Sequence, residues 1–117
     1  MELQECLTLA RFEEKQAFFA SGETRSHGFR ITMLARLKDA IRAREDEIAD
    51  ALAADFGKPR LESYLTEIGI LYEELDHAMR RLKAWMRPQR IPARLALFPT
   101  RYEVTRVPKG IVLIVGP

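Results

Sequence analysis

The sequence contains very little cysteine and histidine. Among its 117 residues are one cysteine, Cys6, and two histidines, His27 and His77. A lone thiol excludes an internal disulfide and is typical of a reducing compartment. Neither histidine has a partner at metal-ligand spacing, and a metal site needs three or four converging ligands. We therefore expect no metal site, no catalytic residue among these groups, and a cytoplasmic location.

The chain also lacks a long apolar run and a large net charge. No stretch approaches the roughly 18 apolar residues that a membrane span needs. The N-terminus is acidic and lacks the basic region and apolar core of a signal peptide. Lys and Arg number 19 against 17 Asp and Glu, for a net charge of +2. We expect neither a nucleic-acid partner nor membrane attachment through this segment.

Apolar residues recur at helical spacing through the first half of the chain. This pattern predicts a helix from Leu3 to about Phe19 and a second helical segment between Phe29 and Leu52. Thr24 or Ser26 could cap the second segment, and Gly22 suits the end of the first. The acidic run 45–47 predicts that a new helix begins there, because carboxylates favour an N-terminal turn. Gly57 followed by Pro59 predicts its end.

A third helix is predicted over residues 61–86, where steps of four and three form one apolar seam. Its members are Leu61, Leu65, Ile68, Tyr72, Leu75, Met79, Leu82 and Met86. Such a seam can pack inside the chain, or it can pair with another copy. The second possibility makes a stand-alone helical interaction or dimerisation module an alternative function.

Basic residues dominate from Arg80 to Arg101, where seven Lys and Arg occur with no acid and Trp85 lies among them. Such interleaving can bind single-stranded nucleic acid. Cations near a helix C-terminus also stabilise the helix, and we favour that interpretation.

The last segment predicts a buried strand. Residues 88–100 contain three prolines and predict an irregular connector, and Tyr102 to Val107 has strand propensity. Ile111 to Val115 is a continuous apolar run between Gly110 and Gly116, as in a parallel sheet covered on both faces. A parallel sheet needs further βαβ units. We therefore interpret the chain as the opening of a larger α/β protein, itself mainly helical with one or two strands at its C-terminal end.

In its ordered motifs the chain resembles the N-terminal region of an aldehyde dehydrogenase, closest to the class 3 and fatty-aldehyde branch. The resemblance extends from about Phe19 to Pro117. It is carried by Phe19-Ala-Ser-Gly-Glu-Thr-Arg25, Ala51-Leu-Ala-Ala-Asp-Phe-Gly-Lys-Pro59, Glu62-Ser-Tyr-Leu-Thr-Glu-Ile68, Leu82-Lys-Ala-Trp85 and Pro108-Lys-Gly-Ile-Val-Leu-Ile-Val-Gly-Pro117.

The resemblance implies NAD(P)-dependent oxidation of an aldehyde to an acid through a cysteine thiohemiacetal and thioester. It places the nucleophile, the general base and the oxyanion-stabilising asparagine after residue 117, so the chain alone should be inactive and bind no cofactor. Residues 1–100 would be a helical segment packed on the cofactor-binding domain, and residues 101–108 a strand of the oligomerisation extension. Residues 109–117 would begin the Rossmann-like domain, with Val115, Gly116 and Pro117 lining the nicotinamide pocket. The implied partners are the rest of the chain and a second subunit.

Cys6 is the lone thiol, but it is a poor candidate for a nucleophile. Its neighbours Glu2 and Glu5 would raise the pKa of the thiol, and it lies outside the region of resemblance. We expect an inert cysteine there. Glu67 lies in one of the matching motifs, and the sequence leaves open whether it supports packing or binds a ligand.

Overall fold

A computed structural model describes residues 2–92, 94 and 99–114, with the backbone alone for residues 2–10. The chain forms two compact units. One comprises residues 31–87, and the other comprises residues 1–30 together with 88–117.

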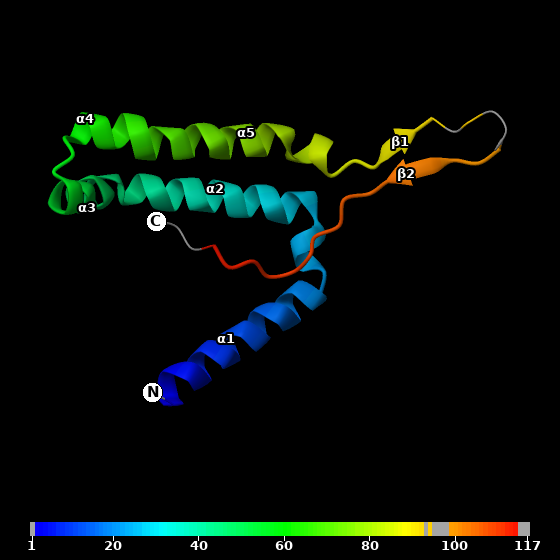
Figure 1. The fold of residues 1–117 in the computed structure, drawn as a ribbon, viewed down its shortest axis with the longest axis horizontal. Helices are drawn as coiled ribbons and strands as arrows, with labels where there is room; N and C mark the ends of the chain where they lie inside the picture. The colour runs from blue at the N-terminus through cyan, green and yellow to red at the C-terminus, as the bar shows by residue number, and fades with distance from the viewer. Residues whose placement is uncertain (1, 93, 95–98, 115–117) are drawn as a thin grey trace. The chain divides into compact units, whose positions relative to one another are not determined.

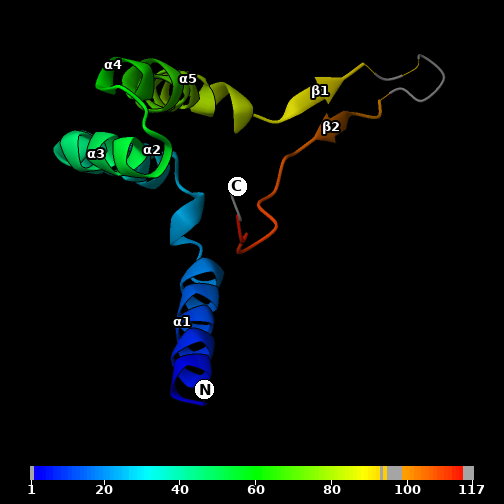
Figure 2. The ribbon, with the colours of Figure 1, turned by 60° about the vertical axis from the view of Figure 1, so that its left-hand side comes forward.

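The unit of residues 31–87 is a helical hairpin. Helix α2 (His27–Ala43) enters it from the other unit, and α3 (Glu45–Phe56) follows after one residue. The chain returns through α4 (Arg60–Ser63), a π-helical turn η2 (Tyr64–Ile68) and α5 (Gly69–Trp85). Figures 1 and 2 both show α5 alongside α2, with α3 and α4 at the closed end. The seam of the third predicted helix is therefore used within the chain.

The helix ends follow the predicted signals. The Ser26 hydroxyl accepts a hydrogen bond from the Phe29 N–H at 3.0 Å, as expected of an N-cap. Helix α3 begins at Glu45, with three acids in its first turn. It ends at Gly57, whose φ of 65° is left-handed and whose N–H donates to the Ala53 carbonyl at 2.9 Å. These three predictions are confirmed.

The predicted seam is wrong in its first two residues. The exposed fractions of Leu61 and Leu65 are 70% and 62%, whereas Ser63 and Ile68 are fully buried. The cause is η2, because a π-helical turn closes its hydrogen bonds over five residues rather than four. Buried positions are consequently five apart across the turn. Beyond it the predicted periodicity holds, with Leu75 buried and its seam neighbours half-buried.

The other unit contains α1 (Glu2–Ala20), a 3₁₀ turn η1 (Glu23–Arg25) and a two-stranded sheet. Helix α1 matches the first predicted helix. Strand β1 (Gln89–Ile91) pairs antiparallel with β2 (Tyr102–Val104), and Arg90 lies opposite Glu103. The expectation of an irregular connector is therefore wrong at residues 89–91. A three-residue strand fits between Pro88 and Pro92, where neither proline interrupts the ladder.

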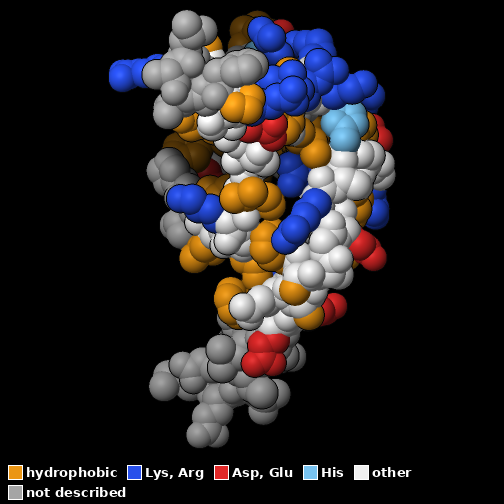
Figure 3. All heavy atoms as spheres, turned by 90° about the vertical axis from the view of Figure 1, so that its right-hand side faces the viewer, with side chains coloured by type: hydrophobic (Ala, Val, Ile, Leu, Met, Phe, Trp, Pro, Cys, Tyr) orange, Lys and Arg blue, Asp and Glu red, His pale blue; other side chains and the backbone are white. Residues whose placement is uncertain are grey.

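The chain is mainly helical with two strands near its C-terminal end, as predicted. Ile111 to Ile114 carry no strand assignment, and Leu113 and Ile114 are each 86% exposed. A buried strand needs neighbours on both sides, and none pairs with this run in the described part of the chain. Figure 3 shows hydrophobic side chains at the surface beside basic ones. Among the helices that the structure describes, none combines the length and apolar character of a membrane span.

Candidate functional site

The predicted cofactor-lining residues Val115, Gly116 and Pro117 lie outside the described residues, so their role stays a prediction. The chain reaches them through Gly110, whose φ of 128° few other residues could adopt. Ile111 to Leu113 lie beside α1, where Arg11, Phe12 and Lys15 complete an apolar groove of about 490 Å³. This groove has no acid–base or nucleophilic pair among its lining residues.

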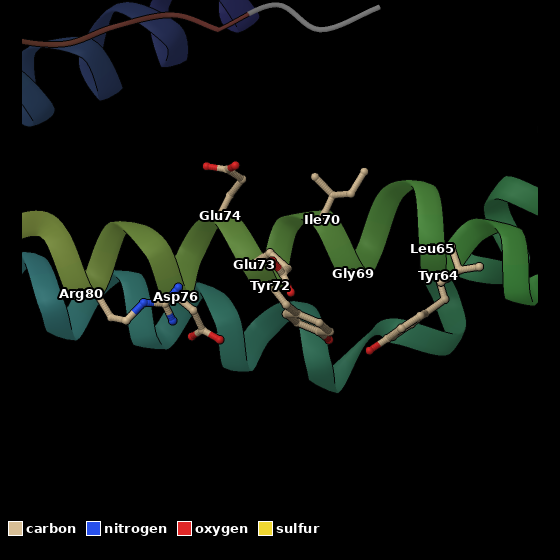
Figure 4. A pocket seen from close by; sticks show the side chains of 9 residues that line it. All are labelled: Tyr64, Leu65, Gly69, Ile70, Tyr72, Glu73, Glu74, Asp76 and Arg80. Atoms are coloured by element: carbon tan, nitrogen blue, oxygen red, sulfur yellow. The ribbon is translucent and has the colours of Figure 1, made fainter.

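A larger concavity lies on the return helix of the hairpin. It is an open groove of about 580 Å³, lined by Tyr64, Leu65, Gly69, Ile70, Tyr72, Glu73, Glu74, Asp76 and Arg80. Figure 4 shows Tyr64, Tyr72 and Asp76 projecting from one side of the helix, while Ile70 and Glu74 point to the other.

The π-helical turn shapes this groove. The Gly69 N–H donates to the Tyr64 carbonyl, which closes the turn. A Cβ at Gly69 would lie 2.9 Å from that carbonyl oxygen and 3.6 Å from the Tyr64 ring. The missing side chain therefore permits the turn and leaves an opening between Tyr64 and Tyr72. π-Helical turns are frequent at functional sites, so the groove merits a chemical test.

Tyr72 lies in the middle of a cluster that joins α5 to α2 and α3. Its hydroxyl donates to the Glu45 carboxylate at 2.9 Å. The Lys38 ammonium and the Arg42 guanidinium each lie 5.9 Å from the ring centroid, within cation–π range. Burial, followed by the hydrogen bond to Glu45, raises the pKa of Tyr72. The phenol therefore stays protonated and acts as a donor.

Asp76 lies one turn further along α5 and pairs with Lys38 at 2.6 Å. The hydrogen bond from Lys38 is the main cause that lowers the pKa of Asp76. The carboxylate is consequently ionised at neutral pH, and its charge is already matched by Lys38. The groove thus offers the Tyr72 hydroxyl, which already donates to Glu45, and the Asp76 carboxylate, which is already paired with Lys38. No thiol or imidazole is among its lining residues. Nucleophilic catalysis needs an activated nucleophile beside a base, and this arrangement supplies neither.

The other polar residues that the sequence suggested take structural places. Glu67 forms an ion pair with Lys58 at 2.7 Å, which fastens the α3–α4 loop to the π-helical turn. Asp46 in the acidic run pairs with Arg60. The His77 ring lies against Trp85, with 5.7 Å between ring centroids. No set of three His, Cys, Asp or Glu gathers for a metal ion within the described ranges.

Cys6 and His27 are brought to no site by the described structure. Cys6 lies in α1, where the side chain is not described, and His27 is the first residue of α2. The sequence analysis missed Lys38 and Arg42 as partners of Tyr72. Both cations lie on the side of α2 that contacts Tyr72 of α5, and no local sequence pattern distinguishes that side of the helix.

Three comparisons with known proteins agree on one family. The model of the "Aldehyde dehydrogenase family" matches residues 10–117. The chain is 37% identical over 107 residues to 4,4'-diaponeurosporen-aldehyde dehydrogenase of Staphylococcus aureus, covering 92% of this chain and 23% of that protein. It is 36% identical over 103 residues to aldehyde dehydrogenase family 3 member H1 of Arabidopsis thaliana, covering 88% and 21%.

The structural comparison points the same way. The substrate-bound state of Staphylococcus aureus AldH matches with a TM-score of 0.81 and 35% identity, over 84% of this chain and 21% of that one. The human relative, family 3 member B1, is 36% identical over 110 residues, which are 94% of this chain and 23% of the relative. The chain therefore spans less than a quarter of the length of these relatives.

Proposed function

The chain belongs to the aldehyde dehydrogenase family, in its class 3 branch, and we propose that it is the N-terminal helical region of an enzyme that oxidises an aldehyde to a carboxylic acid with NAD or NADP. The observation that carries the proposal is the match of residues 10–117 to the family, joined to a TM-score of 0.81.

The reacting groups lie outside these 117 residues in this proposal. The reaction requires a thiolate nucleophile, a general base and an oxyanion donor. NAD(P) would supply the hydride acceptor. The groove on α5 does not suit a dinucleotide, because its lining holds three carboxylates, those of Glu73, Glu74 and Asp76, against the one cation of Arg80. Val115, Gly116 and Pro117 would instead line the nicotinamide end, contributing backbone and shape.

The helices of this chain would pack on the cofactor-binding domain. Exposed apolar side chains support this role, since an enzyme with Leu61, Leu65 and Ile111 to Ile114 uncovered would carry an aggregation-prone surface. In the whole enzyme residues 109–117 would form the first strand of the sheet. Residues 101–108, which include β2, would join the oligomerisation extension of a cytoplasmic homodimer.

Enzyme assays on the full reading frame test the function. We expect the complete polypeptide to reduce NAD or NADP when an aldehyde is supplied, followed at 340 nm, and to release the acid. The 117-residue chain alone should show no such activity. Equal activity in the short chain, or none in the complete polypeptide with either cofactor across short and long aldehydes, would contradict the proposal.

Aspartate substitutions test the buried strand separately. Leu113→Asp and Ile114→Asp place a charge on opposite faces of the proposed strand, so each should greatly reduce soluble, active enzyme. Ala40→Asp is the matched control, because Ala40 is exposed on α2 between the exposed residues Arg36 and Arg44. Tolerance of either strand variant at the level of the control would rule out a strand buried on both faces.

A further inference from the structure

The sequence and the structure of the return arm disagree about its register, meaning which of its residues face the hairpin core. The sequence spaces apolar residues in steps of four, three and four, at Leu61, Leu65, Ile68 and Tyr72. This is the apolar stripe of an uninterrupted α-helix. In the structure the π-helical turn η2 intervenes, so that Leu61 and Leu65 are exposed while Ser63 is fully buried. The stripe therefore fits an α register that the described π register replaces.

The buried position of Ser63 is unfavourable in itself. Its side-chain oxygen is shielded from solvent and makes no hydrogen bond within the described residues. A buried hydroxyl without a partner loses its hydrogen bonds to water and gains none in return. On a continuous α-helix, Ser63 would lie about 200° around the axis from Leu61, opposite the apolar stripe. The α register would thus expose the hydroxyl and turn two leucines toward α3, against which α4 packs.

Three local features favour the π register instead. The Lys58 ammonium pairs with the Glu67 carboxylate at 2.7 Å, which joins the loop before α4 to the turn itself. The Thr66 hydroxyl donates to the Glu62 carbonyl at 2.8 Å, a type of bond that often bends helices. Gly69 permits the turn, since a Cβ there would lie 2.9 Å from the carbonyl oxygen that closes it. Each feature is weak by itself and acts within one or two turns of the helix.

A change of register would move few residues. A π-helical turn holds one residue more than an α-helical turn, so its conversion rotates the preceding segment by about 100° and shifts it by about 1.5 Å. That segment is α4, which has four residues and follows the loop 57–59. Because this loop can take up the rotation, α5 can stay in place against α2.

We propose that η2 is a two-state register switch in the return arm, and that the Lys58–Glu67 ion pair holds it in the π register. In that register Leu65 lines the groove on α5 beside Tyr64 and Gly69 (Figure 4). In the α register Leu65 leaves the groove for the apolar stripe. The register therefore sets the shape of one end of the groove.

Crystal structures of the full-length polypeptide test the two registers directly. The test variant is Gly69→Ala, whose methyl group meets the closing carbonyl of the π-helical turn. The control is Gly28→Ala, whose methyl group meets nothing within 4 Å. We expect Gly69→Ala to show a continuous α-helix from α4 into α5, with Leu65 turned toward the hairpin core and Ser63 outward. The control should keep η2. Retention of η2 in Gly69→Ala would overturn the proposal.

Thiol labelling measures the exchange in solution and does not require Gly69→Ala to fold. Ser63→Cys places a thiol at the buried position, where a small side chain with a weakly polar thiol is tolerated. Trypsin releases residues 61–80 as one peptide without another cysteine, so mass spectrometry can follow its alkylation by iodoacetamide in the full-length polypeptide. Glu67→Gln in this background removes the ion pair. Glu74→Gln is the matched control, because its exposed carboxylate has no ion pair in the described part of the chain.

Loss of the ion pair should raise the labelling rate about two- to fivefold in Glu67→Gln and leave it unchanged in Glu74→Gln. Ser26→Ala removes the cap of α2 without touching the turn, so it separates a change of register from general unfolding. The proposal is overturned if Glu67→Gln is labelled no faster than Glu74→Gln. It is likewise overturned if Ser26→Ala raises the rate as much as Glu67→Gln does.

Discussion

The Tyr72 hydroxyl on α5 donates a hydrogen bond of 2.9 Å to the carboxylate of Glu45, the first residue of α3. Through this contact the return helix is fixed to the junction between α2 and α3. The cations of Lys38 and Arg42 lie over the same tyrosine ring. The Tyr72 side chain therefore interacts with three residues from the opposite arm of the hairpin.

Tyr72→Phe should loosen the hairpin while keeping the ring in place. Loss of a partly buried hydrogen bond to a carboxylate should lower the free energy of unfolding by about 1 kcal/mol. Hydrogen–deuterium exchange in α5 is the measurement, and its protection should fall. Tyr64→Phe is the matched control, since the Tyr64 hydroxyl has no hydrogen-bond partner in the described part of the chain. Equal effects of the two substitutions would show that the Glu45 contact contributes nothing.

The same contact predicts a loss of stability in alkaline solution. Folding raises the pKa of Tyr72 above its ordinary value of 10.0, so the folded state favours the protonated phenol. This contribution is complete below pH 10 and is lost as the pH rises through the folded pKa. Thermal unfolding between pH 9 and 11 should therefore show a steeper decline in the wild type than in Tyr72→Phe. Parallel profiles would contradict it.

Asp76 predicts a loss of stability in acid. Its pKa is held below the ordinary 3.8 mainly by the hydrogen bond from Lys38, so the ionised form is favoured in the folded state. The contribution is present above pH 3.8 and is lost as the pH falls through the lowered pKa. Unfolding profiles from pH 5 to 2 should be flatter for Asp76→Asn. Asp39→Asn on α2 is the control, because its exposed carboxylate has no ion pair within the described ranges.

Two glycines should respond to alanine in opposite directions. Gly69→Ala brings a methyl group against the Tyr64 carbonyl at 2.9 Å and should lower the free energy of unfolding by about 1–3 kcal/mol. Gly28→Ala, in α2, meets nothing within 4 Å and should raise it by about 0.5–1 kcal/mol through helix propensity. Urea unfolding measures both. A stable Gly69→Ala protein would show that the π-helical turn can revert to an α-turn at no cost.

Two serines should likewise differ. The Ser63 hydroxyl is fully buried and has no hydrogen-bond partner among the residues that the structure describes, so Ser63→Ala should leave stability unchanged or increase it. Ser26→Ala removes the cap of α2 and should cost about 1 kcal/mol. Thermal unfolding compares the two variants. A large loss in Ser63→Ala would indicate that this hydroxyl is hydrogen-bonded through a buried water.

The sequence predicted much of the fold because the helix ends depend on local chemistry. Ser26, Gly57 and Pro59 act within one turn of their own positions, so their effect needs no knowledge of distant residues. The candidate site was much less predictable. Lys38 and Asp76 are 38 positions apart, and Glu45 and Tyr72 are 27 apart. Which charges meet depends on how α5 lies against α2, and the periodicity of either helix alone does not specify it.

The sequence by itself determined the family, the helix boundaries and the apolar run at residues 111–115, because each rests on residue order or on interactions within a few positions. Only the tertiary structure decided that Ser63 is buried while Leu61 and Leu65 are exposed. A uniform helix would have buried both leucines, but Gly69 allows a π-helical turn that shifts the buried face by one residue. Tertiary structure also decided that residues 89–91 form a strand, since a strand exists only when a partner such as β2 completes its hydrogen bonds.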